Sequence, residues 1–404
     1  MSTSDPSDPA IPTLPDPERV LSRDTLDDLT SRGFTRRSLF RVAGLVAAGA
    51  TLPFTSEPAL AQLSSLGGRI SADAVKINAN EFPIGPSPAA LEALVRVAKR
   101  GNRYQYPETF ELVSTIARLE NVAEDRIAIY PGSSLALQHT VLAFTGPERA
   151  LVTVDPGFEA AARSAEFVDA PVVRVPLRED GSHDVKAMLA AAKAQPTGLL
   201  YVCTPNNPTG TITARSDVEW LLANKPPGTV MLLDEAYLHF CDEPGGSDLV
   251  AADKDVVVIR TFSKIYGMAG LRAGFTMARP DLLERVTGFK SGAMPATAMA
   301  ATHAMLKEPD LVPTRKRENT KRREKLFAFF DEHGFEYTDS QSSKLMVDVR
   351  MPTKAFIDAM AEKEVFVGRP WPAWPTHDRI SLGSETEMAR FEAAFLEVVG
   401  EAGV

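Results

Sequence analysis

Residues 261–275 read TFSKIYGMAGLRAGF, and they place one lysine, Lys264, between Ser263 and a glycine-rich run that leads to Arg272. The start of a helix needs one capping side chain, but it does not need a hydroxyl, an amine and a guanidinium at this spacing. A site that holds a phosphate and bonds covalently to a carbonyl group uses all three. Taken alone, Lys264 would be a solvated lysine and Ser263 a helix cap, so the rest of the chain decides the interpretation.

Apolar, β-branched runs alternate with helical patterns from residue 126 onward. Segments rich in alanine and leucine at helical spacing, such as residues 184–194, separate several of these runs. Continuous apolar strands separated by helices predict an α/β fold with a mainly parallel sheet that helices cover on both faces. The predicted strands are residues 126–130, 150–154, 172–176, 198–202, 229–234, 255–260 and 274–278.

Five of the predicted strands end in a polar or turn-forming cluster. One such cluster would be ordinary loop chemistry. In parallel sheets, however, ligands collect at the carboxyl ends of the strands, so five clusters in sequence predict one assembled site. In chain order the clusters read PGSS, DPGF, TPNNPTG, DEAY and TFSK.

The ordered set of TPNNPTG, DEAY and SK followed by GLR resembles the fold-type I pyridoxal-phosphate (PLP) enzymes. More closely, it is similar to the histidinol-phosphate aminotransferase branch of the class I/II aminotransferases, from residue 78 to residue 383. The resemblance implies a large domain with a mainly parallel mixed sheet covered by helices, plus a smaller α+β domain. It also implies pyridoxal 5′-phosphate as the cofactor and transamination between an L-amino acid and a 2-oxo acid.

The resemblance implies a role for each residue at the reacting end of the cofactor. Lys264 would hold the cofactor aldehyde as a Schiff base and move the substrate α-proton. Asp234 would keep the pyridine nitrogen protonated, and Asn207 and Tyr237 would contact the ring oxygen. Lys264, Asp234 and Tyr237 are therefore the predicted catalytic residues.

The cofactor phosphate needs hydrogen-bond donors, which the sequence offers in two places. Ser263 and Arg272 supply one group, and Ser133 and Ser134 supply another at a helix start after a glycine. By resemblance, Phe158 would stack on the cofactor ring. Tyr106 would reach the phosphate site of a neighbouring subunit, which implies a homodimer.

Substrate-binding residues follow from the same resemblance. Arg379 would bind the substrate carboxylate in a bidentate manner, Asn80 would border the substrate, and Arg369 would be a second substrate-facing arginine. Three departures from the family pattern bear on the substrate: Ile84 in place of a tyrosine, Ser134 and Leu135 in place of an acidic pair after the glycine, and Lys344-Leu345 in place of Asn-Phe.

Lys344, Trp371 and Trp374 each have two possible interpretations. Lys344 would favour acidic substrates if it lined the entrance, but a surface lysine is the simpler interpretation. Trp371 and Trp374 would either line the pocket or stiffen a surface loop. The loss of the tyrosine at Ile84 argues against a phosphate-bearing substrate.

The first sixty-one residues predict an export signal in place of a folded domain. Residues 1–30 have a composition typical of disorder. Arg36 and Arg37, a short apolar run and the sequence Ala59-Leu60-Ala61 before Gln62 match a twin-arginine (Tat) signal, which predicts a periplasmic location. The apolar run is too short and too rich in alanine and glycine for a stable membrane span.

The remaining chain is predicted to form an N-terminal arm with part of the small domain (62–105), a large PLP-binding domain (106–304) and a C-terminal small domain (305–404). The net charge of -9 over 404 residues gives no support to nucleic-acid binding. The basic run at residues 315–325 alternates with polar residues and is read as a solvated helix face. No metal site is predicted.

Two alternatives to transamination stay open at the level of sequence. One is a different reaction with the same cofactor, such as that of a lyase, decarboxylase, racemase or oxidase, because the fold does not fix the reaction type. The other is a non-catalytic binding protein with the same fold. The two cysteines, Cys203 and Cys241, are read as buried thiols, although one bridge between them is compatible with the sequence.

Overall fold

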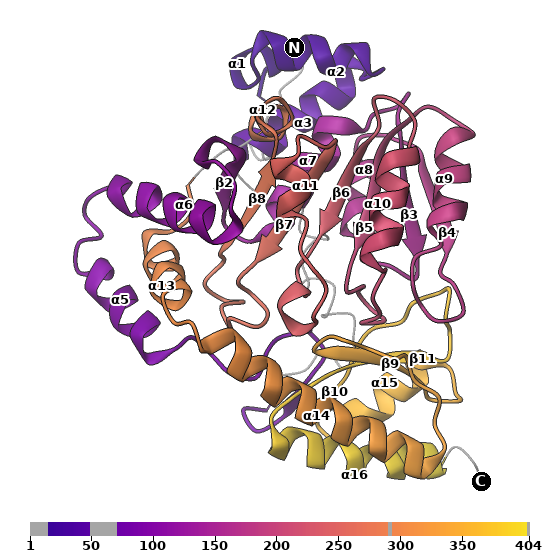
Figure 1. Cartoon of the computed structure of the whole chain (residues 1–404). Coiled ribbons are helices and arrows are strands. Elements are labelled where there is room, and N and C mark those ends of the chain that lie inside the picture. Colours follow the sequence, from indigo (N-terminus) through magenta and orange to yellow (C-terminus); the bar gives the residue numbers. More distant parts are fainter. Residues whose placement is uncertain (1–14, 49–70, 290–292, 402–404) are drawn as a thin grey trace, which may run out of the picture.

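The computed structural model of the chain describes residues 15–48, 71–289 and 293–401 (Figure 1). A seven-stranded sheet with the order β2-β8-β7-β6-β5-β3-β4 forms the centre of the large domain. Strands β7, β6, β5, β3 and β4 run parallel, whereas β8 runs antiparallel to both of its neighbours. The strands are β2 (Ile127–Tyr130), β3 (Ala150–Asp155), β4 (Val172–Pro176), β5 (Thr197–Cys203), β6 (Val230–Asp234), β7 (Val256–Thr261) and β8 (Gly274–Ala278).

The central strands are buried along their whole length, which explains their unbroken apolar sequences. Every residue of β5, β6, β7 and β8 is buried, because helices cover the sheet on both sides (Figure 1). The covering helices are α7 (Ser133–Phe144), α8 (Ala160–Phe167), α9 (Val185–Lys193), α10 (Arg215–Asn224), α11 (Ser247–Ala251) and α12 (Pro280–Thr287), with the short turns η2 (Glu124–Arg126) and η3 (Leu238–Phe240). The predicted α/β architecture is confirmed.

A helical arm projects from one side of the large domain. It consists of α5 (Pro88–Ala98), α6 (Tyr106–Glu120) and α13 (Ala296–Leu306), which lie at the left in Figure 1. Helices α5 and α13 pack closely against each other, with Ala93, Val97 and Ala300 buried between them.

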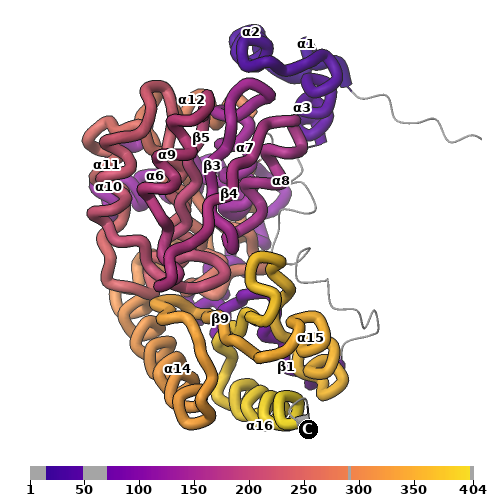
Figure 2. The backbone as a smooth tube through the Cα atoms, turned by 90° about the vertical axis from the view of Figure 1, so that its right-hand side faces the viewer, coloured from indigo at the N-terminus to yellow at the C-terminus, as the bar shows by residue number. Residues whose placement is uncertain are grey.

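The small domain has its own apolar core below the large domain (Figure 2). Phe330, Phe356 and Phe391 all contact the ring of Phe395, with centroids 5.5–5.6 Å apart. The strands pair as β1 with β10 (parallel) and β9 with β11 (antiparallel). The elements are β1 (Val75–Lys76), α14 (Leu311–His333), β9 (Lys344–Asp348), α15 (Thr353–Glu362), β10 (Val365–Phe366), β11 (His377–Ser381) and α16 (Glu385–Glu401).

One side of the basic helix α14 is buried. The prediction that residues 315–325 form a solvated helix face is therefore wrong for that side. Arg315, Asn319 and Arg323 recur every four residues and are at most 7% exposed. Arg315 donates hydrogen bonds to the carbonyls of Ile265 (2.8 Å) and Gly85 (2.6 Å). This side of α14 therefore holds the loop that follows Lys264.

Residues 15–48 fold into three helices that pack on the end of the large domain remote from the small domain (Figures 1 and 2). They are α1 (Pro17–Val20), α2 (Arg23–Ser31) and α3 (Arg36–Ala48). This differs from the disorder predicted for residues 1–30, because Asp16 and Ser22 cap helix starts and Leu29 and Val42 join the main core. Residues 1–14 and 49–70, which include the predicted cleavage site, lie outside the described residues.

Arg32 fastens these helices to the large domain. It is 1% exposed, and its Nη1 donates to the carbonyls of Leu142 (2.8 Å) and Thr145 at the end of α7. Asp28 pairs with the same guanidinium at 2.8 Å. Burial lowers the pKa of Arg32 to about 10, although the Asp28 carboxylate opposes the shift. The last carbonyls of a helix favour such a cation.

The two cysteines are free thiols. Cys203 and Cys241 are both buried and are not bonded to each other, as expected for packed thiols. Within the described ranges, none of the helices combines the length and apolar character needed to cross a membrane.

Replacing Arg32 by methionine tests how strongly α1–α3 are attached. Methionine fills a similar length with an apolar side chain but removes the donors to α7. We therefore expect the full-length chain to lose about 2–3 kcal/mol in its free energy of unfolding. Urea titration followed by circular dichroism measures this loss. The exposed Arg19→Met variant serves as the control, and an Arg32→Met curve that overlays the control curve would contradict the attachment.

Candidate active site

A cavity of about 350 Å³ lies at the carboxyl ends of the strands, where the sequence placed the site. It is bounded by the ends of β5, β6 and β7 and by the start of α7. The predicted residues that line it are Ser133, Ser134, Phe158, Asn207, Asp234, Tyr237, Ser263, Lys264 and Arg272. The structure thus brings together side chains that are up to 139 positions apart in the chain (Ser133 to Arg272).

Lys264 points its amine into this cavity and is 8% exposed. Its Nζ donates to the backbone carbonyl of Asn80 at 2.7 Å. The Asn80 side chain, which is fully buried, donates to the hydroxyl of Tyr237 at 2.5 Å. Asn80 therefore lies beside the predicted catalytic residues and connects two of them.

Asp234 ends β6 with its carboxyl group buried in the cavity wall. Tyr201 donates to one carboxyl oxygen at 2.9 Å, and the Ala236 N–H donates to the other at 3.1 Å. Burial raises the pKa of Asp234 to about 6, although these hydrogen bonds and the Lys264 charge oppose the shift. Sequence reasoning missed Tyr201, because within a buried strand it reads as a core residue.

The other end of the cavity is suited to an anion. Gly132, at φ +87°, starts α7, and a Cβ at this position would collide with the guanidinium of Arg272. Arg272 Nη1 contacts Ser263 Oγ at 3.3 Å and the Ala269 carbonyl at 2.9 Å. Burial lowers the pKa of Arg272, so an anion beside it would restore a favourable environment for the charge.

Arg379 comes from β11 of the small domain and is buried next to the cavity. Its Nη1 donates to Asn207 Oδ1 at 3.0 Å, and its Nη2 donates to the Asn78 carbonyl at 2.6 Å. The predicted carboxylate-binding arginine therefore contacts a residue that lines the cavity.

Arg369, the second predicted substrate-facing arginine, does not line the cavity described above. It is 2% exposed and pairs with Glu159, with Nη2 2.6 Å and Nε 3.3 Å from the two carboxylate oxygens. The indole of Trp371, which is buried, lies 4.3 Å from Arg369 and 5.2 Å from Arg379. Trp371 thus packs on both arginines, whereas Trp374 is only half-buried and packs on His377.

Tyr106 and Lys344 both lie outside the lining of the cavity. Tyr106 is 66% exposed on α6 and does not line the cavity of its own chain. Lys344 is fully buried, so the interpretation as a surface lysine is wrong. It begins β9, and its backbone pairs with Ser381 in the ladder that carries Arg379.

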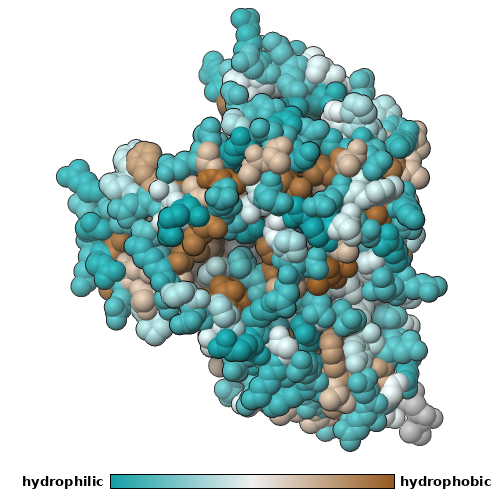
Figure 3. All heavy atoms as spheres, in the orientation of Figure 1, coloured by the Kyte–Doolittle hydropathy of each residue, from teal (hydrophilic) through white to brown (hydrophobic). Residues whose placement is uncertain are grey.

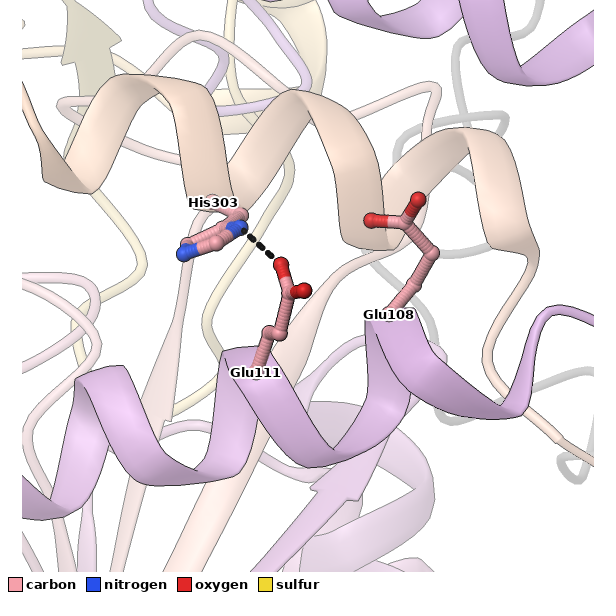
Figure 4. Close-up of side chains that lie close together, drawn as sticks. All are labelled: Glu108, Glu111 and His303. Atoms are coloured by element: carbon pink, nitrogen blue, oxygen red, sulfur yellow. Dashed lines mark ion pairs between the residues drawn. The ribbon is translucent and has the colours of Figure 1, made fainter.

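A second group of titratable side chains lies on the arm (Figure 4). Glu108 and Glu111 on α6 face His303 on α13, and the His303 Nδ1 is 3.7 Å from Glu111. Protein contacts account for these groups, since Glu108 pairs with Arg100 at 3.3 Å and His303 Nε2 contacts Thr115 at 3.1 Å. The group therefore links two helices of the arm.

Comparison with known proteins identifies the class. Residues 72–395 match the family model of the class I and II aminotransferases, and the chain belongs to this family. It is a PLP-dependent aminotransferase.

The chain is 34% identical to a histidinol-phosphate aminotransferase of Symbiobacterium thermophilum, over 81% of this chain and 91% of that one. It is 32% identical to an aromatic amino acid aminotransferase of Cutibacterium acnes, over 81% and 93%. The crystal structure of the Sinorhizobium meliloti histidinol-phosphate aminotransferase in complex with pyridoxal-5′-phosphate superposes with a TM-score of 0.77 at 26% identity, covering 87% of this chain and 96% of that one.

The residues present fit this cofactor. The start of α7 with Arg272 and Ser263 offers donors for a phosphate, and the buried carboxyl of Asp234 gains from a cationic partner such as a protonated pyridine nitrogen. Lys264 offers an amine between them. When bound, the cofactor supplies an electron sink for the substrate carbon, which protein side chains lack.

The pKa of Asp234 predicts how cofactor binding depends on pH. Pairing with the ring nitrogen requires the ionised carboxylate, so affinity should be level above about pH 6 and fall, by up to roughly tenfold per pH unit, as Asp234 takes up a proton below it. Equilibrium dialysis across this range measures the profile.

Tyr201→Phe provides the matched variant for this profile. It removes a hydrogen bond that lowers the pKa of Asp234, so the break should move to higher pH. An affinity break that stays in place in Tyr201→Phe would show that another group controls the profile.

Proposed function

We propose that this aminotransferase acts on an L-amino acid, with a 2-oxo acid as acceptor, and that Arg379 binds the α-carboxylate. The observation that carries this proposal is the contact between Arg379 Nη1 and Asn207 Oδ1 at 3.0 Å, because Asn207 also lines the cavity that contains Lys264. A carboxylate on the planar guanidinium would leave the α-carbon directed towards the Lys264 amine.

The side chains divide the work between binding and proton transfer. Lys264 accepts the α-proton of the substrate and returns a proton to the product. Asp234 would hold the opposite end of the bound cofactor in its charged form, and Tyr237, which Asn80 orients, would hold the ring oxygen. The buried walls exclude water, which strengthens each of these interactions.

Two features argue for a substrate without a phosphate group. Ile84 offers no hydrogen-bond donor on its side chain, and Arg369 is already paired with Glu159 at 2.6 Å. A free amino acid, such as the substrate class in the name of the Cutibacterium acnes relative, fits these features better than a phosphorylated amine.

Two substitutions test this proposal. Lys264→Ala should abolish both the visible absorbance of the lysine-bound cofactor and turnover. Arg379→Met should keep the absorbance but lower kcat/KM for amino acids by roughly 100-fold, the value of a lost bidentate charge pair. A spectral screen with and without a 2-oxo acid measures both effects, with the exposed Lys254→Ala as control. Turnover that survives in Lys264→Ala, or that needs no acceptor, would overturn the proposal.

The arm supports a homodimer, which is the usual state of fold-type I aminotransferases. Within the described part of the chain, six of the eight exposed large apolar side chains fall between residues 91 and 119. Apolar atoms also gather where the arm meets the body in Figure 3. In a dimer that buries this surface, Tyr106 would reach the partner's phosphate site. The six side chains are Leu91, Val95, Tyr104, Tyr106, Phe110 and Leu119.

Phe110→Glu tests the dimer. Phe110 is 70% exposed in the single chain, so the substitution should leave the subunit folded but weaken its self-association by roughly 100-fold or more. Analytical ultracentrifugation measures the dissociation constant. Leu396→Glu, at an exposed position of the small domain, is the control. Equal dimer strength in the two variants would place the interface elsewhere.

Export by the Tat route to the periplasm is the third part of the proposal. Its support is the sequence of residues 31–62 together with the exposure of Arg36 and Arg37 at the start of α3. These guanidiniums face solvent, while Val42 and Val46 of the following apolar run are buried.

Replacing both Arg36 and Arg37 by lysine should block export without changing stability, because both side chains are exposed. Fractionation of a Gram-negative host into periplasm and cytoplasm gives the result. The control is the double variant Arg19→Lys and Arg23→Lys, at two other exposed positions. It makes the same two arginine-to-lysine changes outside the twin-arginine pair and should export normally. Periplasmic accumulation of the first variant would contradict the route.

A further inference from the structure

Lys344 places a second ammonium group against Tyr237, a residue that lines the active-site cavity. Its side chain is fully buried. Its Nζ lies 3.1 Å from the centroid of the Tyr237 ring and 3.1 Å from the hydroxyl of Ser342. The aromatic face stabilises a cation at this position through its quadrupole.

The β9–β11 ladder fixes where Lys344 points. Arg379 pairs with Met346, and Lys344 pairs with Ser381. Because alternate residues share one face of a ladder, Lys344 and Arg379 are diagonal neighbours on the same face. Lys344 therefore approaches Tyr237 from the same face of the ladder that carries Arg379, the proposed carboxylate-binding residue.

Lys264 approaches the same aromatic ring. Its Nζ is 5.5 Å from the centroid of Tyr237, so two buried lysines face one aromatic ring. The two ammonium groups therefore lie no farther apart than the sum of their distances to the ring centroid. Like charges this close inside a protein each disfavour the proton on the other. Lys344 is closer to the ring, so the ring favours the charge on Lys344 over the charge on Lys264.

The charged and titratable groups around Lys264 do not cancel this effect. Asp234 is the buried carboxylate that faces Lys264. In the cofactor-loaded protein the ring nitrogen would pair with this carboxylate. Glu81 also borders the cavity but is exposed to solvent. Other ionisable groups of the described chain that line or adjoin the cavity are the cations Arg272 and Arg379 and the ring of Tyr237 itself. Burial also raises the pKa values of the nearby Tyr201 and Cys203 side chains.

We propose that Lys344 is a positioning residue for the reactive amine: its charge, held against Tyr237, drives the proton from Lys264 into solvent. A neutral amine is what both steps of the reaction require, since it bonds to the cofactor aldehyde and accepts the substrate proton. A neighbouring cation is a known means of activating a lysine. The inference rests on the proposed role of Lys264.

The test is a pH titration of the visible absorbance of the cofactor-loaded protein. This absorbance reports the proton on the Lys264 nitrogen while that nitrogen is bonded to the cofactor, where the Lys344 charge would act on it in the same direction. Lys344→Met removes the charge but keeps a side chain of similar length. The midpoint should therefore rise by about one pH unit, which is a tenfold change in the ratio of protonated to unprotonated nitrogen at a given pH. Lys344→Arg keeps the charge and should titrate close to wild type. Lys325→Met, on the exposed side of α14, should not shift.

The outcomes separate the inference from the function beneath it. An unshifted midpoint in Lys344→Met, or an equal shift in Lys344→Arg, would overturn the role of Lys344 while the cofactor chemistry stands. If Lys344→Met fails to fold, Lys344→Gln is titrated in its place under the same criteria. A wild-type protein that shows no visible band with pyridoxal 5′-phosphate would instead overturn the assignment of Lys264 itself.

Discussion

Asp234 is a carboxyl group withdrawn from water at the end of a strand in which all five residues are buried. Removing a carboxylate from water costs several kcal/mol, and this cost is the reason its pKa rises. The sheet has to hold β5 and β6 in register so that the Tyr201 hydroxyl reaches the carboxylate. A cationic ring at this point relieves the remaining cost. The sheet, the cavity and the cofactor are therefore linked through one buried charge.

The active site also depends on the contact between the two domains. The TPNNPTG loop of the large domain is tied to the strand region of the small domain, because Thr338 donates to the Thr209 carbonyl at 2.6 Å and the Gln341 N–H donates to the Gly210 carbonyl at 2.9 Å. A Cβ at Gly210 would collide with the small domain. Because Asn207 belongs to this loop, its contact with Arg379 positions the proposed carboxylate-binding group relative to the cavity that contains Lys264.

Much of the fold could be predicted from the sequence, because buried parallel strands leave unbroken apolar runs. The order of the polar clusters also predicted the cavity residues, since the carboxyl ends of parallel strands meet at one edge. Lys344 and Arg315 show the limit of this reasoning. A buried cation and a surface cation look alike in sequence, and only the Tyr237 ring for Lys344 or the Ile265 and Gly85 carbonyls for Arg315 distinguish them.

The N-terminal helices illustrate a different limit. Their composition is polar enough for disorder, yet the buried Arg32 and the apolar Leu29 attach them to the large domain through long-range contacts that local patterns do not reveal. Docking also means that any receptor for residues 15–48, such as the one on the proposed export route, would compete with their packing on the large domain. The apparent affinity of such a receptor would be its intrinsic affinity multiplied by the fraction of molecules in which the segment is released. On that route, the stability of this attachment would therefore limit how strongly the segment is recognised.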